Sequence, residues 1–126
     1  MTPIAQAFVL RTLRQPVEGC GAAVVNGAAG TVAAPAPAPF LRGAAARVVP
    51  WSLSRAAAVL HSHARRIVRS GEGLEASPDE RVVINIIEAL GRGDRDAALH
   101  ASEWLVRPSG REALLRALQP AADGLR

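Results

Sequence analysis

Residues 77–91 read SPDERVVINIIEALG, and this stretch decides the fold class of the chain. Ser77 and Glu80 have the spacing of a capping box, in which each side chain accepts a hydrogen bond from the backbone N–H of the other residue. The run VVINII is rich in β-branched residues, which also suit a strand. Because the capping box leads into a helix-like continuation, IIEALG, we predict a helix over 78–90. Apolar residues cover more than half of its circumference, so it is expected to be the central buried helix.

Two further helices are expected after this one, with very short connections between them. Asp94 can cap a helix over 95–106, on which Trp104 is expected to face inward. The sequence SGRE at 109–112 repeats the capping-box pattern before a helix over 113–118. Such short connections make consecutive helices antiparallel neighbours.

An amphipathic helix is predicted over 52–70, with Ser52 as its cap and Gly71 just after its end. Apolar residues such as Leu53 and Leu60 fall on one stripe at 100° per residue. The opposite side is basic, and its arginines are Arg55, Arg65, Arg66 and Arg69.

The chain before this helix has a different character. Thr2 can cap a short helix over 3–14. Residues 19–50 are rich in Ala, Gly and Pro and poor in charge, which favours a flexible linker. We therefore predict an all-α fold, a small bundle of about four to five short helices. Its expected parts are a short N-terminal helix (1–18), a linker (19–50) and a helical domain (51–126).

The composition indicates a thin hydrophobic core. Hydrophobic residues make up 49% of the 126 positions, but 26 of these positions are alanine, which buries little area. Two Trp, two Phe and no Tyr leave few large side chains to fill a core. We therefore expect closely packed helices, or a partner or second copy that completes the core.

The charge is distributed unevenly along the chain. All 15 basic residues are arginine. Residues 1–71 hold eight of them and one acid, Glu18, for a net charge of +7, whereas residues 72–126 hold seven arginines and ten acids, for −3. Such asymmetry indicates either an anionic partner for the first part or electrostatic docking of one part on the other. The sequence leaves both explanations open.

The expected compartment is the cytoplasm. Cys20 is the single cysteine, so no intrachain disulfide can form and a reducing environment is the default. Arg11 and Arg14 follow the apolar stretch IAQAFVL instead of preceding it, which argues against a signal peptide. No apolar run approaches the ~20 residues that span a bilayer, so we expect no membrane span.

No group of residues has the spacing of a catalytic, cofactor-binding or metal site. On a helix His61 and His63 lie about 200° apart, and a metal ion needs converging ligands. His100 and Glu103 have the i, i+3 spacing of an ordinary surface pair. The sequence lacks a Gly-rich phosphate loop and the CxxC and HExxH motifs. We therefore expect that the protein is not an enzyme and that it uses no cofactor or metal.

One segment has the pattern of a helical repeat. Gly93 and Asp94 lie at the turn between two predicted helices, and Ala98 stands where a small packing residue is expected. With these features, residues 85–108 resemble one tetratricopeptide-type helical hairpin. The first helix lacks the aromatic residues of that family, and Pro108 comes about two residues early for the ~34-residue period. Membership of the family would imply a peptide-binding groove.

These observations favour a non-catalytic helical protein-interaction or regulatory module, which is oligomeric or docks on a protein partner. The alternative is sequence-nonspecific nucleic-acid binding through the helix predicted over 52–70. In that case Arg55, Arg65, Arg66 and Arg69 would neutralise phosphates. The same basic side could also face solvent or bind the acids of the C-terminal part, and the sequence does not decide between these uses.

Overall fold

The structure, a computed structural model, describes residues 1–14, 40–65, 71–73 and 75–125. Within these ranges the chain forms helices only, apart from one isolated β-bridge, so the predicted all-α bundle is confirmed. The helices are α1 (Pro3–Leu13), α3 (Ala45–His63), α4 (Pro78–Gly91), α5 (Arg95–Ser102) and α6 (Pro108–Gly124).

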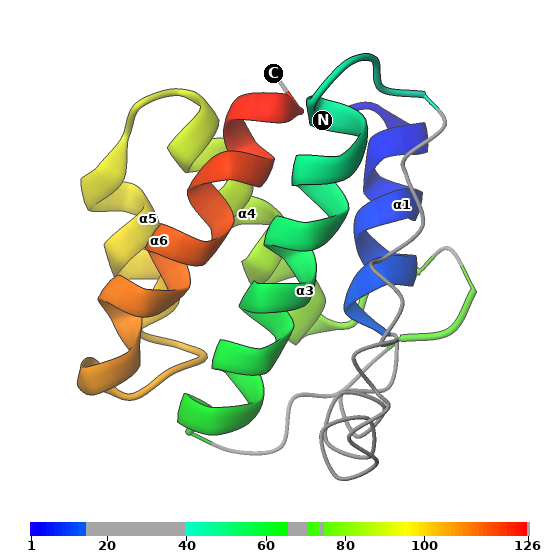
Figure 1. The fold of residues 1–126 in the computed structure, drawn as a ribbon. Helices are drawn as coiled ribbons and strands as arrows, with labels where there is room; N and C mark the ends of the chain where they lie inside the picture. Colours follow the sequence, from blue (N-terminus) through cyan, green and yellow to red (C-terminus); the bar gives the residue numbers. More distant parts are fainter. Residues whose placement is uncertain (15–39, 66–70, 74, 126) are drawn as a thin grey trace, which may run out of the picture.

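Helices α3 and α6 make the most extensive contact between any two of the described helices, and they run side by side in opposite directions (Figure 1). Two glycines permit this close approach. A Cβ atom on Gly110, at the start of α6, would come within 3.0 Å of the side chain of His63, at the end of α3. A Cβ atom on Gly124, at the end of α6, would likewise come within 3.0 Å of the Val49 side chain. Only glycine therefore fits at either end of this helix pair without displacing its neighbour.

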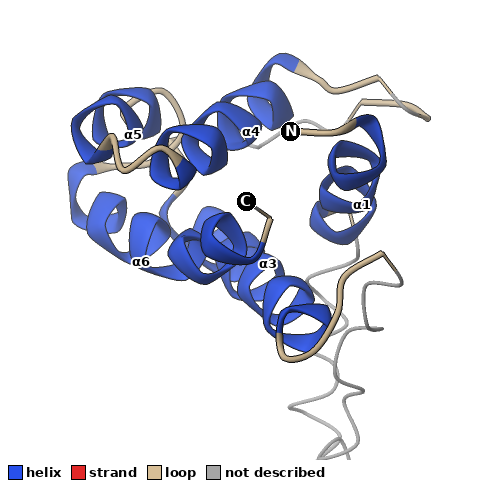
Figure 2. Cartoon of the chain, turned by 90° about the horizontal axis from the view of Figure 1, so that it is seen from above, coloured by secondary structure: helices blue, strands red, loops and turns tan. Residues whose placement is uncertain are grey.

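The other helices surround this pair and share one hydrophobic core. α4 packs on α5 and α6, and α1 packs on α3 and α4. Seen from above, α1 and α5 lie at opposite sides of the molecule (Figure 2). Val9 and Leu10 of α1 belong to the same buried cluster as the side chains of α3 to α6. The residues 3–14, expected to form a separate N-terminal helix, are thus part of the common core.

The N-terminal signals of α1 and α4 act as predicted. The Thr2 hydroxyl accepts a hydrogen bond from the Ala5 N–H at 3.2 Å. At α4 the Ser77 hydroxyl accepts from the Glu80 N–H at 3.1 Å, and the Glu80 carboxylate accepts from the Ser77 N–H at 3.0 Å, which completes the capping box. α4 is also the buried helix that its sequence predicted, with its core side chains being Val83, Ile84, Ile86, Ile87, Ala89 and Leu90.

The boundaries predicted for the basic helix are wrong at both ends. α3 begins at Ala45, inside the range 19–50 that was expected to be a linker, and Pro50 lies in its interior. Ser52 is therefore not a cap. Its buried hydroxyl donates to the Ala117 carbonyl of α6 and accepts from the Ala121 N–H at 3.1 Å.

At its other end α3 stops at His63, seven residues before the predicted end, because the chain pairs with another segment. Ala64 forms an antiparallel bridge with Val106. The Arg65 N–H donates to the Leu105 carbonyl, and the Arg107 N–H donates to the His63 carbonyl, each at 2.9 Å. These bonds take the place of further helical turns.

The last two helices also differ from their predicted bounds. α5 ends at Ser102, so Trp104 lies beyond it and is 70% exposed instead of facing inward. α6 is capped at Arg107, with no side-chain hydrogen bond, so the capping box expected at 109–112 does not form. It then continues through Pro120 to Gly124, well beyond the predicted end at 118.

Candidate functional site

The side of α3 turned away from the core is the strongest candidate for a functional surface. Val49, Leu53, Ala56 and Leu60 are buried against the other helices. The opposite side chains recur at helical spacing and are all exposed. We call this set the α3 outward face, and its residues are Arg47, Val48, Trp51, Arg55, Ala58 and Ser62.

This face is basic and partly apolar. α3 contains no acidic residue, and within the described residues neither Arg47 nor Arg55 has a carboxylate partner within 4.0 Å. Trp51 is 49% exposed and Val48 is 39% exposed. The Arg55 guanidinium lies over the Trp51 ring, 4.8 Å from its centroid. Such stacking uses the flat side of the guanidinium and leaves its N–H groups free to bind an anion.

Of the four predicted arginines the structure describes two, Arg55 and Arg65, and these two do not lie on the same helix. Arg55 is exposed on α3 as expected. Arg65 is exposed but lies beyond the end of the helix, and its Nε donates to the Glu103 backbone carbonyl at 2.8 Å. Arg66 and Arg69 lie outside the described residues. The basic face predicted over 52–70 therefore stays a prediction for Arg66 and Arg69, and the exposed arginine that the structure places on α3 within that range is Arg55.

Arg47, Val48 and Trp51 belong to this surface, and the sequence prediction missed them. The signal was present, because Arg47, Trp51 and Arg55 follow one another at four-residue intervals and fall on one helix face. The prediction missed this signal because it placed residues 19–50 in a linker, and Pro50, in the interior of the observed helix, is a residue type that is uncommon there.

One arginine of the first half does bind the acids of the second half. Arg14, the C-cap of α1, donates from Nε to Glu80 Oε2 at 2.8 Å and from Nη2 to Glu80 Oε1 at 3.0 Å. It also donates to the carbonyl oxygens of Gly73 and Glu75, at 2.6 and 2.7 Å. The explanation of the charge asymmetry by internal docking therefore holds for Arg14, but not for Arg47 or Arg55.

The same contacts determine the acidity of Glu80. Burial would raise the pKa of its carboxyl, but hydrogen bonds from Arg14 and from the Ser77 and Gly71 N–H groups outweigh burial and hold the pKa below its usual value. The hydrogen bond with Glu80 in turn raises the pKa of Arg14. Both groups are charged at neutral pH, and their contacts are structural because they join α1, α4 and the loop between α3 and α4.

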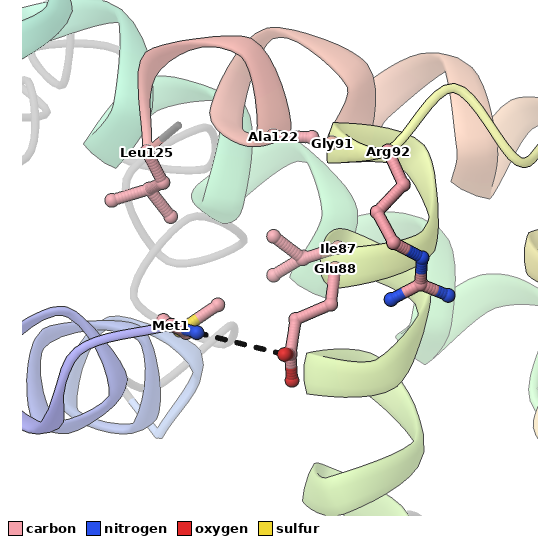
Figure 3. A pocket seen from close by; sticks show the side chains of 7 residues that line it. All are labelled: Met1, Ile87, Glu88, Gly91, Arg92, Ala122 and Leu125. Carbon is pink, nitrogen blue, oxygen red and sulfur yellow. Dashed lines mark ion pairs between the residues drawn. The ribbon is translucent and has the colours of Figure 1, made fainter.

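A pocket of about 290 Å³ lies where the start of α1 meets the ends of α4 and α6 (Figure 3). Ile87, Ala122 and Leu125 form its apolar wall. At its rim the Glu88 carboxylate lies 3.5 Å from the Met1 amino group. This ion pair engages the Glu88 carboxylate, and Arg92 is the other charged side chain among the lining residues.

The histidines belong to no group of three potential metal ligands in the described part of the chain. His61 is exposed, whereas His63 is half-buried beside Gly110. His100 lies 3.9 Å from Glu103 on the surface. No three His, Cys, Asp or Glu side chains come together among the described residues, and none of the described helices is long and apolar enough to cross a membrane.

Comparison with models of known families finds none that matches the chain, and no curated protein or solved structure matches it either. The tetratricopeptide resemblance of residues 85–108 is thus not accompanied by a family match.

Proposed function

We propose that this protein is a non-catalytic helical interaction module that docks on a protein partner through the α3 outward face. The observation that supports this proposal most is the exposed Trp51 between Arg47 and Arg55, two arginines without a carboxylate partner among the described residues. Tryptophan and arginine are the residue types most enriched at the energetic centres of protein interfaces. A helix that presents both residue types on one side is suited to recognition.

A different protein suits this face better than a second copy of the chain. A symmetric dimer places the same surface on both subunits. Two α3 outward faces would then bring Arg47 and Arg55 of one copy against those of the other, without an acid on α3 to compensate. Like charges placed against each other oppose association.

Nucleic-acid binding is the second candidate, and the lack of acidic residues on α3 favours it. The described part of the face, however, offers only Arg47 and Arg55 as unpaired charges, with the apolar Val48 and Trp51 between them. Strongly salt-dependent binding to DNA involves about 6–10 phosphate contacts. We therefore place a protein partner first.

Site-specific crosslinking in cells that make the protein tests this proposal. A photoreactive amino acid replaces Trp51, and a matched control carries it at Arg116, an exposed position on α6. We expect a protease-sensitive adduct at position 51, absent at 116, that disappears when Arg47 and Arg55 are changed to glutamate. A nuclease-sensitive adduct would support the second candidate instead. Equal labelling at both positions would contradict docking through α3.

A further inference from the structure

We infer that the α3 outward face binds an acidic amphipathic segment of its partner, with a carboxylate held by Arg55 and an apolar residue packed on Val48 and Trp51. This inference rests on the proposed function and names the chemistry of the partner. It follows from the arrangement of three exposed side chains on α3, which are Val48, Trp51 and Arg55.

Arg55 is prepared for a carboxylate. Its guanidinium is already ordered over Trp51, at 4.8 Å from the ring centroid, while its N–H edge has no carboxylate partner within the described residues. A planar guanidinium binds a carboxylate through two parallel N–H···O bonds in its own plane. The ring and the anion therefore use different parts of the group. Because the side chain is ordered beforehand, less conformational entropy is lost on binding.

Arg47 sets the spacing of a second acid. It stands eight residues before Arg55, which corresponds to about 12 Å along a helix axis, and both belong to the same exposed side of α3. Carboxylates seven residues apart on a partner helix lie about 10.5 Å from each other on one face. The long arginine side chains can absorb the difference. Leucines between these acids would lie on Val48 and Trp51, which are the apolar part of the face.

Other anionic partners fit this surface less well. One side of the Trp51 ring is occupied by Arg55, so that side is not available for base stacking. A helix that lies in a membrane interface needs its apolar side free for the lipid. The apolar side of α3, which includes Val49 and Leu53, is buried in the core instead.

The experiment uses the full chain and a labelled helical peptide in which two glutamates, seven residues apart, bracket two leucines. Fluorescence anisotropy measures its binding, and a peptide with glutamine in place of both glutamates is the reference. We expect saturable binding of the acidic peptide only. Arg55→Gln should weaken it about tenfold or more, equivalent to about 1.4 kcal/mol. Arg116→Gln, which removes an exposed arginine on α6, is the matched control and should leave the affinity unchanged.

A second readout locates the contact. The chain has two tryptophans, so in a Trp104→Phe background the intrinsic fluorescence reports on Trp51 alone. We expect the acidic peptide to change this signal with the same dissociation constant as the anisotropy gives.

The possible outcomes either support or overturn the binding of an acidic segment. They also distinguish a failure of this inference from a failure of the proposed docking through α3. Equal binding of the glutamine peptide, with loss of binding in Trp51→Ala, would overturn the acidic partner while retaining docking on α3. Absence of peptide binding at millimolar concentration would also overturn it, and the crosslinking at position 51 would then decide the proposed function independently. Tighter binding of random duplex DNA, falling steeply with salt, would overturn both.

Discussion

Replacing Ser52 by alanine should lower the free energy of unfolding, because its hydroxyl joins the two helices with the largest contact. The hydroxyl donates to the Ala117 carbonyl and accepts from the Ala121 N–H at 3.1 Å. These are the two groups that an uninterrupted α-helix pairs with each other. Ser52 thus lies within the hydrogen-bond ladder of α6 at a fully buried position.

The magnitude follows from the number of bonds. Each intramolecular hydrogen bond contributes about 0.5–1.5 kcal/mol net, so the loss of two gives about 1–3 kcal/mol. Alanine is the better helix former by roughly 0.5 kcal/mol, which offsets part of this loss. Ser54→Ala, on the same helix, has the same propensity gain and loses no hydrogen bond found in the described residues. The difference between the two variants therefore isolates the contribution of the Ser52 contacts.

Urea unfolding followed by far-ultraviolet circular dichroism measures both variants. We expect Ser52→Ala to be less stable than Ser54→Ala by at least about 1 kcal/mol, with an unchanged m value. If the two variants unfold with the same free energy, the contacts of Ser52 do not stabilise the α3–α6 pair and the reasoning is refuted.

Pro120 provides a second test of the same contact. Proline lacks the N–H that would bond to the Arg116 carbonyl, and its ring presses on that carbonyl. This perturbation lies beside the site where the Ser52 hydroxyl enters the ladder of α6. With alanine at position 120, the backbone hydrogen bonds of α6 can form without the Ser52 hydroxyl. Ser52→Ala should therefore lower the free energy of unfolding by less in the Pro120→Ala background than in wild type. A double-mutant cycle should give a coupling energy of about 0.5 kcal/mol or more.

Two further predictions concern packing and pH. In Gly110→Ala, overpacking against His63 should cost about 1–3 kcal/mol, and the gain of about 1 kcal/mol in helix propensity offsets part of it, so a net destabilisation of up to about 2 kcal/mol is expected. Thermal unfolding measures this beside the exposed control Ser109→Ala, which should stay within about 0.5 kcal/mol of wild type. Equal melting temperatures for wild type and Gly110→Ala would contradict the prediction. Because the folded pKa of Glu80 is lowered, its stabilisation is complete above the unfolded pKa of about 4.3 and is lost as the pH falls from there through the folded pKa. The stability difference between wild type and Glu80→Gln should therefore be constant from pH 5 to about pH 8 and shrink below about pH 4.

The parts of the fold that the sequence predicted are those determined by neighbouring residues. The capping box of Ser77 and Glu80 involves groups within three positions of one another, and it forms as expected. The Thr2 cap of α1 is equally local. Such signals need no knowledge of the tertiary structure, because both hydrogen-bonding partners are visible in the same short stretch.

The errors arise where a distant segment changes the outcome. The helices predicted over 52–70 and 113–118 exclude Pro50 and Pro120, but the structure places both prolines inside helices whose packing tolerates a missing N–H. Ser52 looked like a cap, although its partners are Ala117 and Ala121, on α6. The early end of α3 depends on hydrogen bonds between residues 63–65 and 105–107. None of these partners could be identified from the local pattern.

The candidate surface was predicted in part for the same reason. Arg55 was identified from its polar position on an amphipathic helix, and the structure places it on the exposed side of α3. Arg47 and Trp51 were missed because the helix begins before Pro50. The packing of Arg55 on Trp51 is a local i, i+4 contact, so it would have been predictable once the start of the helix was known.

Helix α3 has its core contacts on one side and the proposed recognition surface on the other. Ser52, Leu53 and Ala56 face the core, and Arg55 with Trp51 faces away from it. Removing an exposed cation–π contact changes stability by only about 0.5–1 kcal/mol, so Arg55→Gln should remain folded while losing the guanidinium. A large loss of binding in that variant therefore reports on recognition. A similar loss in Ser52→Ala would instead reflect movement of the whole helix, which distinguishes a residue that contacts the partner from one that positions the surface.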